Sequence, residues 1–527
     1  MKVTAVIGVI LLIGIYYYVT LPAINIHASE FWMYLVVLVI LAAVVFIRKK
    51  NLNRYDWKES KGLKVILGIL AVLVIAYVAG SVLSSPIVNA KKYQELLTVK
   101  NGEFTKDIEE LSFDQIPLLD KDSAELLGDR KMGSMVDMVS QFEVSDLYSQ
   151  INYQGQPYRV TPLVYANAIK WLTNQKDGIP AYIRIDMATQ NTELVKLEDG
   201  IKYSESELLN RNIYRHLRFR YPTYMFDQLS FEINDDGVPY WICPVKKFNI
   251  GLFGGQTIGK VVLCNAITGE TEEYKIKDCP QWVDRAYPAD LLIDLYNYHG
   301  TLKNGFFNSV LGQKGCLKTT DGYNYLALED DVWVYTGITS VSGDRSNVGF
   351  ILMNQRTMET RYYSCAGAEE YSAMESAEGQ VQNLKYTAAF PLLLNISNEP
   401  TYFMALKDGA GLVKKYAMVN IQKYQNVAIG DTVSECEKAY VKLLASNGIT
   451  STDEKSTGTN EISGKIKRIG QAVIDGNSHF YLALEENDEV YDVPVVDYPE
   501  IVTYDVGDEI TLEYSEDSPA NVVLGIK

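Results

Sequence analysis

Three apolar runs at the start of the chain constrain its fold more than any other feature. Val3–Leu21, Phe31–Ile47 and Val65–Ser85 are each long enough to cross ~30 Å of hydrocarbon as a helix. Lys2 before the first run is also typical of a signal peptide, but no tidy small-residue cleavage site follows, and two further runs come at once. The sequence therefore predicts that residues 1–88 form a membrane anchor of three uncleaved transmembrane helices.

The basic residues between these runs predict their orientation. The first loop, Pro22–Glu30, has no Lys or Arg, whereas the second carries six basic residues: Arg48, Lys49, Lys50, Arg54, Lys58 and Lys61. Basic loops are retained in the cytoplasm. We therefore expect a multi-pass protein of the cell membrane, with a cytoplasmic N-terminus and a large extracytoplasmic domain after Ser85.

The remainder of the chain is acidic and has the composition of a globular protein. The 527 residues include 49 Lys and Arg against 66 Asp and Glu, a net charge of −17. Because phosphate binding needs clustered cations, nucleic acid is not expected as a partner. No pair of cysteines has zinc-site spacing, so disulfides and buried free thiols are the alternatives for the six: Cys243, Cys264, Cys279, Cys316, Cys365 and Cys436.

A short pattern recurs four times in this acidic part. An apolar strand ends in Asp or Asn, a polar turn follows, and a second strand begins; the copies are Asp186–Asn191, Asn265–Glu270, Asn354–Glu359 and Asn420–Gln425. Asp and Asn suit such turns because they bond their own backbone. A second signature precedes each copy: Gly178–Tyr182, Gly237–Trp241, Gly322–Tyr325 and Glu399–Phe403.

Helical patterns precede several of these copies, at Pro162–Thr173, Glu205–Arg218 and Ala377–Tyr386. Each unit is therefore expected to be a helix followed by antiparallel strands, which gives an α+β fold class. The predicted units are 160–200, 204–276, 286–365 and 375–445. Together they make a tandem repeat domain over residues 160–445, preceded by an α+β connecting region at 89–159.

The arrangement of Gly237–Trp241 followed by Asn265–Glu270 resembles a PepSY-type module. That resemblance implies small α+β domains of the kind found in bacterial envelope proteins and protease propeptides, often linked to restraint of peptidases. Over Gln115–Leu444 the chain is also similar to a family of uncharacterised multi-pass membrane proteins of Gram-positive bacteria. Stretches such as Leu127–Gly133 and Thr401–Asp408 carry this second likeness. Neither resemblance implies catalytic residues.

A polar stretch, residues 446–460, predicts a linker before a last domain at 461–527. Six short strands are expected there: Ser463–Ile474, His479–Leu484, Glu489–Pro494, Ile501–Tyr504, Glu509–Tyr514 and Asn521–Ile526. Strands this short and dense predict a small OB-like or SH3-like β-barrel. Residues 461–527 hold 15 acidic and 4 basic side chains, a difference of −11, so this barrel should repel phosphates and face a protein or a cation, or act as a spacer.

One basic and aromatic cluster stands out in the acidic domain, and we take it as the candidate partner-binding site: Arg211, Tyr214, Arg215, Arg218, Phe219, Arg220 and Tyr221. Such a cluster can bind an anionic polymer, lipid headgroups or an acidic protein surface. Pairing with acids of the same chain is the alternative interpretation.

No catalytic, cofactor or metal motif is found. Gly254–Lys260 matches part of a phosphate-binding loop, but Val261 stands where a hydroxyl should meet magnesium, and a glycine-rich hairpin is favoured. The four histidines, His27, His216, His299 and His479, lack neighbours at the spacing of a nucleophile or metal motif. Asp330–Asp331 and Glu485–Glu489 offer a calcium site or a carboxylate pair, with solvated hairpin tips as the alternative.

The sequence therefore favours a non-enzymatic, membrane-anchored binding or scaffolding protein of the cell envelope. Regulation of an envelope protease or of wall synthesis is its most concrete version. The first alternative is an extracytoplasmic hydrolase of peptide or glycan, which would need a half-buried acid pair in a cleft. The second is a small-ligand sensor, which would need an apolar pocket.

Overall fold

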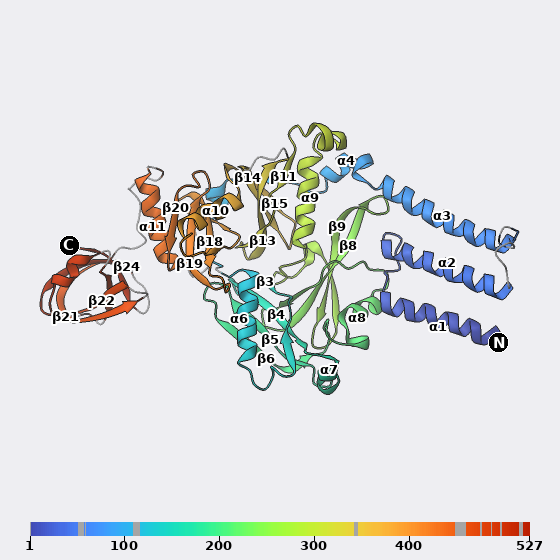
Figure 1. Ribbon diagram of the computed structural model, residues 1–527, viewed down its shortest axis with the longest axis horizontal. Helices are drawn as coiled ribbons and strands as arrows, with labels where there is room; N and C mark the ends of the chain where they lie inside the picture. The colour runs from blue at the N-terminus through green and yellow to red at the C-terminus, as the bar shows by residue number, and fades with distance from the viewer. Residues whose placement is uncertain are drawn as a thin grey trace. The chain divides into compact units, whose positions relative to one another are not determined.

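The computed structural model describes the whole chain except residues 1, 51–56, 58, 109–115, 118, 342–345, 448, 450–459, 475–476, 486, 488, 496–497 and 516–519. It is a mixed α+β protein with several sheets and two compact units, Met1–Leu444 and Ala445–Lys527 (Figure 1). Most of the predicted linker, 446–460, lies outside the described residues.

The first unit begins with three apolar helices that lie side by side, α1 (Lys2–Thr20), α2 (Ser29–Lys50) and α3 (Lys61–Leu83) (Figure 1). Among the described residues, α2 and α3 are long and apolar enough to cross a membrane, whereas the described apolar part of α1, Gly8–Thr20, is shorter. Two long apolar helices near the N-terminus are thus consistent with membrane anchoring.

Aromatic residues gather where α1 ends and α2 begins. The rings of Tyr16 and Tyr34 stack at 5.4 Å, and Trp32 lies 6.1 Å from Tyr77 near the end of α3. The opposite end of α2 carries Arg48 and its basic neighbours. Aromatic residues at one end and cations at the other match the two interfaces of a bilayer.

After the helices come four antiparallel meanders of four consecutive strands each, which we call the first to fourth meander. The first meander consists of β3 (Ser149–Tyr153), β4 (Gln156–Tyr165), β5 (Ile179–Asp186) and β6 (Thr192–Ile201), and the second of β7 (Ser230–Ile233), β8 (Pro239–Ile250), β9 (Gly254–Asn265) and β10 (Thr271–Lys275). The third consists of β12 (Asn324–Leu328), β13 (Asp331–Ser340), β14 (Ser346–Asn354) and β15 (Thr360–Ala368). The fourth consists of β17 (Leu392–Ile396), β18 (Glu399–Lys407), β19 (Val413–Asn420) and β20 (Val427–Gly430). Short strands widen three of these sheets: β2 (Phe142–Val144), β1 (Lys100–Asn101), β11 (Leu317–Thr319) and β16 (Thr387–Ala388).

The four meanders share one hydrogen-bond register at the recurring turn. The turn-opening residue and its cross-strand partner are Asp186 and Tyr158, Asn265 and Tyr240, Asn354 and Trp333, and Asn420 and Thr401. In every meander the residue after the turn opener donates its N–H to the carbonyl of the residue before that partner; the bonds are Met187 to Pro157, Ala266 to Pro239, Gln355 to Val332 and Ile421 to Pro400. The four turns are therefore equivalent in position.

This register corrects the second sequence signature in two meanders. The equivalent of Gly237–Trp241 in the first meander is Gly155–Arg159, at the start of β4, and the equivalent in the third is Asp330–Val334. Gly178–Tyr182 instead leads into β5, and Gly322–Tyr325 leads into β12. In each of these meanders two strands begin with a similar sequence, and the sequence analysis chose the wrong one of the two.

The first three turns also share their chemistry. The Oδ1 atom of Asp186, Asn265 or Asn354 accepts the N–H groups two and three residues ahead at 2.8–3.0 Å. The fifth turn residue has positive φ in each case, at Gln190, Gly269 and Met358. In the fourth meander the turn is one residue longer, and Asn420 Oδ1 accepts only from Lys423 N at 2.8 Å. Side-chain bonding to the local backbone explains why this turn could be predicted.

A helix precedes each meander, and these helices coincide only in part with the predicted ones; they are α6 (Lys121–Gly133), α8 (Ile213–Arg220), α9 (Ala289–Thr301) and α10 (Glu370–Gln380). The prediction at Pro162–Thr173 was wrong for its first half, because β4 extends to Tyr165 and only α7 (Ala168–Asn174) is helical. Residues 159–163 are buried in the sheet, and burial overrode the apparent helical pattern. Since β4 runs through residue 160, the first unit begins inside the predicted connecting region.

Two further helix predictions also need correction. In place of a helix over Glu205–Arg218, only the 3₁₀ turn η3 (Leu209–Arg211) and α8 are helical. The helix predicted at Ala377–Tyr386 is α10, which ends at Gln380. Further helical segments among the described residues of this unit are α4 (Pro86–Gln94), α5 (Phe104–Asp107), η4 (Ile276–Asp278), η5 (Asn308–Gly312) and most of α11 (Val433–Ser446).

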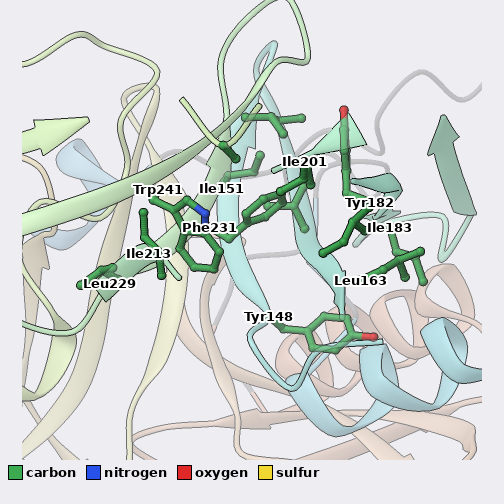
Figure 2. Packing of buried hydrophobic residues seen from close by; sticks show 14 of the residues in the cluster. Tyr148, Ile151, Leu163, Tyr182, Ile183, Ile201, Ile213, Leu229, Phe231 and Trp241 are labelled. Carbon is green, nitrogen blue, oxygen red and sulfur yellow. The ribbon is translucent and has the colours of Figure 1, made fainter. Parts of the chain in front are cut away.

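The centre of the second sheet, around the first half of β8, is buried on both faces. Because side chains alternate along a strand, Trp241 and Cys243 enter a core shared with the first meander, while Ile242 enters a core shared with α9 and the third meander. Figure 2 shows the first of these cores, in which Phe231 and Trp241 lie 5.5 Å apart. This double burial fixes the central position of the second meander.

The unit Ala445–Lys527 contains a closed barrel of β21 (Asn460–Ile474), β22 (Asn477–Leu484), β23 (Val490–Pro494), β25 (Asn521–Ile526) and β24 (Glu509–Ser515), in that order around the barrel. Five of the six predicted strands are thereby confirmed. The strand predicted at Ile501–Tyr504 is wrong, because Pro499 opens a short 3₁₀ helix, η6 (Pro499–Thr503). Ile501 on that helix is buried in the barrel core, which accounts for its apolar character.

Candidate functional site

The basic and aromatic cluster lies on and around α8, and α8 packs against the end of α1. Arg218 Nε donates to the carbonyl oxygen of Leu21 at 2.9 Å, and its Nη1 donates to Tyr224 O at 2.6 Å. The Arg215 guanidinium lies over the Tyr18 ring at 4.8 Å. A cation at this position is favourable because the last carbonyls of a helix lack intrahelical partners.

Most of the other cluster residues also have partners within the chain. Arg211 donates to Gln175 O, Tyr214 bonds the Glu205 carboxylate, and the hydroxyl of Tyr221 lies 2.9 Å from Thr271 Oγ1. Phe219 contacts Tyr17 and Tyr18 with one part of its ring and is otherwise exposed, as is Arg220. The structure thus brings the seven residues together, but it uses most of them to hold α8 against α1 and its own surroundings.

The hairpin between β8 and β9 makes a second junction with the apolar helices. Ser84 Oγ, after the last residue of α3, accepts the N–H groups of Leu252 and Phe253 at 2.8 and 3.1 Å. His27 Nδ1 lies 2.7 Å from Leu252 O. Gly251 has φ +60°, and a Cβ there would collide with Ser84. The glycine-rich segment therefore allows close approach of a hairpin tip to α3, and Gly254–Lys260 forms the start of β9.

A buried acidic network lies where the first and second meanders meet the segment before α9. Glu232 accepts the N–H groups of Asp284 and Arg285 at 2.9 and 3.1 Å, and Asp284 Oδ2 accepts from Asn152 N at 2.7 Å. Burial raises the pKa of Glu232 to about 7. Burial and then the charge of Glu232 raise the pKa of Asp284 well above its ordinary value. Both side chains are enclosed by protein, so this pair does not form the half-buried acid pair in a cleft that a hydrolase needs.

The acidic residues singled out in the sequence have structural roles as well. Asp331 forms a bidentate pair with Arg356 at 2.6 and 2.9 Å and accepts from Asn354 Nδ2 at 2.7 Å, which ties the two turns of the third meander together. Asp330 lies in the β12–β13 turn. In the second acidic group, Glu486 and Asp488 lie outside the described residues. Within the described part of the chain, no group of three or more His, Cys, Asp or Glu is placed to hold a metal ion.

The histidines and cysteines are likewise placed by the fold. Each histidine ring has a hydrogen-bond partner: Leu252 O for His27, Gly269 O for His216, Gln94 O for His299 and Asp492 for His479. All six cysteines are free and buried, which decides between the two alternatives left by the sequence. Burial raises the pKa of Cys279 to about 12, so its thiol stays protonated at neutral pH.

An open groove of about 620 Å³ lies between the third and fourth meanders. Its lining comes from β14, β15, α10 and the fourth recurring turn: Ser346, Gly367, Ala368, Ser372, Glu375, Ser376, Gln422 and Tyr424. Ligand sites are typically concave spaces of roughly 300–1,000 Å³ with a few convergent polar groups. The sequence prediction missed this groove; the signal available was the pair Ser372 and Ser376, four apart on one face of a helix.

A buried polar cluster supports one wall of this groove. The Tyr402 hydroxyl donates to the carbonyl of Ala368 at 3.1 Å and accepts from Asn347 Nδ2 at 3.1 Å. Tyr335 donates to the buried carboxylate of Glu370 at 3.2 Å. Because Ala368 itself lines the groove, these bonds position its backbone without relying on surface side chains.

Compared with protein-family models and with curated proteins, the chain matches none.

Proposed function

We propose that this protein is a non-enzymatic, membrane-anchored binding protein of the cell envelope, and that the groove between the third and fourth meanders is its binding site. The groove carries the proposal because it is open, of ligand size and lined by side chains that donate and accept hydrogen bonds. Such a lining fits an extended polar ligand, a peptide or glycan of the cell wall. Tyr424 supplies an exposed aromatic face for stacking.

In this proposal the three apolar helices span the membrane, with the N-terminus in the cytoplasm and the meanders outside. The support is the separation of aromatic residues at one end of the helices from Arg48, Lys49 and Lys50 at the other. A reporter fused after Lys527 should be extracytoplasmic, whereas one inserted within residues 48–62 should be cytoplasmic. A cytoplasmic C-terminus would overturn both the topology and the assignment to the envelope.

The helix-plus-meander units support the likeness to PepSY-type modules, and the anchor supports the likeness to multi-pass proteins of Gram-positive bacteria. The terminal barrel is proposed to be OB-like: β21 pairs with both β22 and β24, and β23 pairs with β25 in parallel. With its charge difference of −11, this barrel should not retain single-stranded DNA at physiological salt.

The binding proposal is tested with purified full-length chain and solubilised wall fragments. Tyr424→Ala should weaken binding by about 5- to 150-fold, as expected for the loss of a stacking side chain worth about 1–3 kcal/mol. Tyr214→Ala is the matched control, because Tyr214 is similarly exposed on α8. A loss of binding in the control alone would move the site to α8, and turnover of the fragments would overturn the non-enzymatic assignment.

A further inference from the structure

We propose that residues 302–316, which we call the apolar lobe, sit in the lipid headgroup layer beside α3 and give the extracytoplasmic domain a second contact with an anionic bilayer. This proposal rests on the proposed membrane-spanning role of α1–α3. It adds a surface that the anchor itself does not contain.

The root of the apolar lobe is connected directly to the end of α3. The Tyr93 hydroxyl donates to Ser84 O at 2.6 Å, and the rings of Tyr93 and Tyr298 lie 4.8 Å apart. Phe306, in the lobe, packs on the same small core as Tyr93. Figure 1 shows α4 beside both the end of α3 and α9. The lobe is therefore anchored at the level where α3 leaves the membrane.

The lobe displays three exposed apolar side chains at and around the π-helical turn η5. Phe307, Val310 and Leu311 lie within five residues of one another and are 70%, 55% and 80% exposed. Two hydrogen bonds within the lobe stabilise this segment: Asn304 and Asn308 both donate to Lys314 O, at 2.9 and 3.1 Å. Apolar side chains presented in this way on a supported loop indicate a surface that leaves water on binding.

The charge around the lobe identifies the partner. In a chain of net charge −17, residues 302–316 contain Lys303 and Lys314 and no acid, and α4 contains Lys91 and Lys92 and no acid. Glu95, one residue beyond α4, pairs with Lys91 at 3.7 Å. Exposed apolar residues flanked by lysines are the pattern of an interfacial membrane contact with anionic lipid.

The experiment uses the full-length chain in nanodiscs of phosphatidylglycerol and phosphatidylcholine, with a spin label at Leu311→Cys. The parent chain measures background labelling, which should be low because its cysteines are buried. Relaxation by oxygen, which concentrates in lipid, is compared with relaxation by a water-soluble nickel complex. We expect the Leu311→Cys label to favour oxygen, and a label at Val136→Cys, an equally exposed apolar position after α6, to favour nickel.

Two further labels make the outcome decisive. Val72→Cys on α3 should favour oxygen; a Val72 label in water would overturn the spanning helices themselves and this proposal with them. A Val72 label in lipid with a Leu311 label in water overturns the lobe alone, and a Leu311 label shielded from both reagents assigns it to a protein contact instead. Replacing Lys91, Lys92, Lys303 and Lys314 by Gln should raise nickel accessibility at Leu311 at least about twofold in anionic discs. No such rise would overturn the role of anionic lipid.

Discussion

The first and second meanders meet through a dry apolar core, whereas the third and fourth enclose a polar groove. Phe231 and Trp241 fill the first junction, while serines, Gln422 and Tyr424 line the second. Both junctions are built from the same helix and meander with the same turn register. The helix-plus-meander fold therefore does not determine how two neighbouring units pack. The side chains at the junction decide whether it becomes an apolar core or a binding surface.

The strongest test of this comparison removes one large side chain from each junction. Trp241→Ala should lower the free energy of unfolding by about 3–5 kcal/mol, because it removes buried contacts and leaves a cavity. Tyr424→Ala should cost under about 0.5 kcal/mol, since its ring is exposed in the groove. Chemical unfolding of the full-length chain in detergent measures both. Similar losses for the two variants would contradict the division into core and site.

The polar cluster beneath the groove gives a second, smaller effect. Tyr402→Phe removes the buried hydroxyl that bonds both Asn347 and the carbonyl of Ala368, which should cost about 1–3 kcal/mol. Tyr182→Phe, which removes a single bond to Gly237 O at the dry junction, should cost about 0.5–1.5 kcal/mol. If ligand binding is unchanged while Tyr402→Phe lowers stability, the cluster supports the fold without positioning the groove.

The acidic network near the dry junction should make stability depend on pH. Burial raises the pKa of Glu232 to about 7, so the folded protein holds a proton that the unfolded chain releases at its ordinary pKa near 4.5. The resulting stability is fully present below pH ~4.5 and is lost as the pH rises through about 7. Glu232→Gln should flatten the unfolding free energy between pH 5 and 7.

Ser230→Ala is the matched control for that experiment. It removes the bond from Ser230 Oγ to Glu232 at 3.1 Å but leaves the carboxyl in place, so the dependence on pH should persist. An unchanged slope in Glu232→Gln would assign the effect to the neighbouring Asp284, whose pKa is also raised.

Local chemistry explains which features could be predicted from the sequence. The recurring turns were found because Asp186, Asn265 and Asn354 bond their own backbone within three residues. Most barrel strands were found for a similar reason, since their alternation and turns are local. The first half of the helix predicted at Pro162–Thr173 was wrong because burial on both faces of β4 depends on neighbours that are distant in the sequence.

Neither the contacts of the α8 cluster nor the groove could be predicted, because both join segments that are distant in the sequence. Arg218 bonds Leu21, 197 positions away, so nothing near α8 revealed that this arginine serves a helix end. The groove brings Ser346 to Tyr424 across two meanders, and only the fold places them together. Three residues of the cluster, Arg215, Arg218 and Phe219, contact the end of the chain's own first helix. The role of the cluster as a partner-binding site stays a prediction.

The smallest expected effect concerns the turns that open the meanders. In the first meander Gln154 and Gly155 both have positive φ, and in the fourth Ser397 and Asn398 do. A two-residue turn of this kind favours Asn before Gly, because Asn tolerates the left-handed region better than Gln. Gln154→Asn should therefore raise the free energy of unfolding by about 0.5 kcal/mol, despite losing the exposed bond to Asp235 O.

Gln156→Asn, two residues on at the start of β4, is the control. It should bring no gain, because that residue has no positive φ to relieve. Thermal unfolding of the two variants beside the parent chain separates them. If both variants are more stable than the parent chain, the gain comes from the Asn side chain and not from the positive φ of the turn. The meanders would then differ in more than the side chains at their junctions.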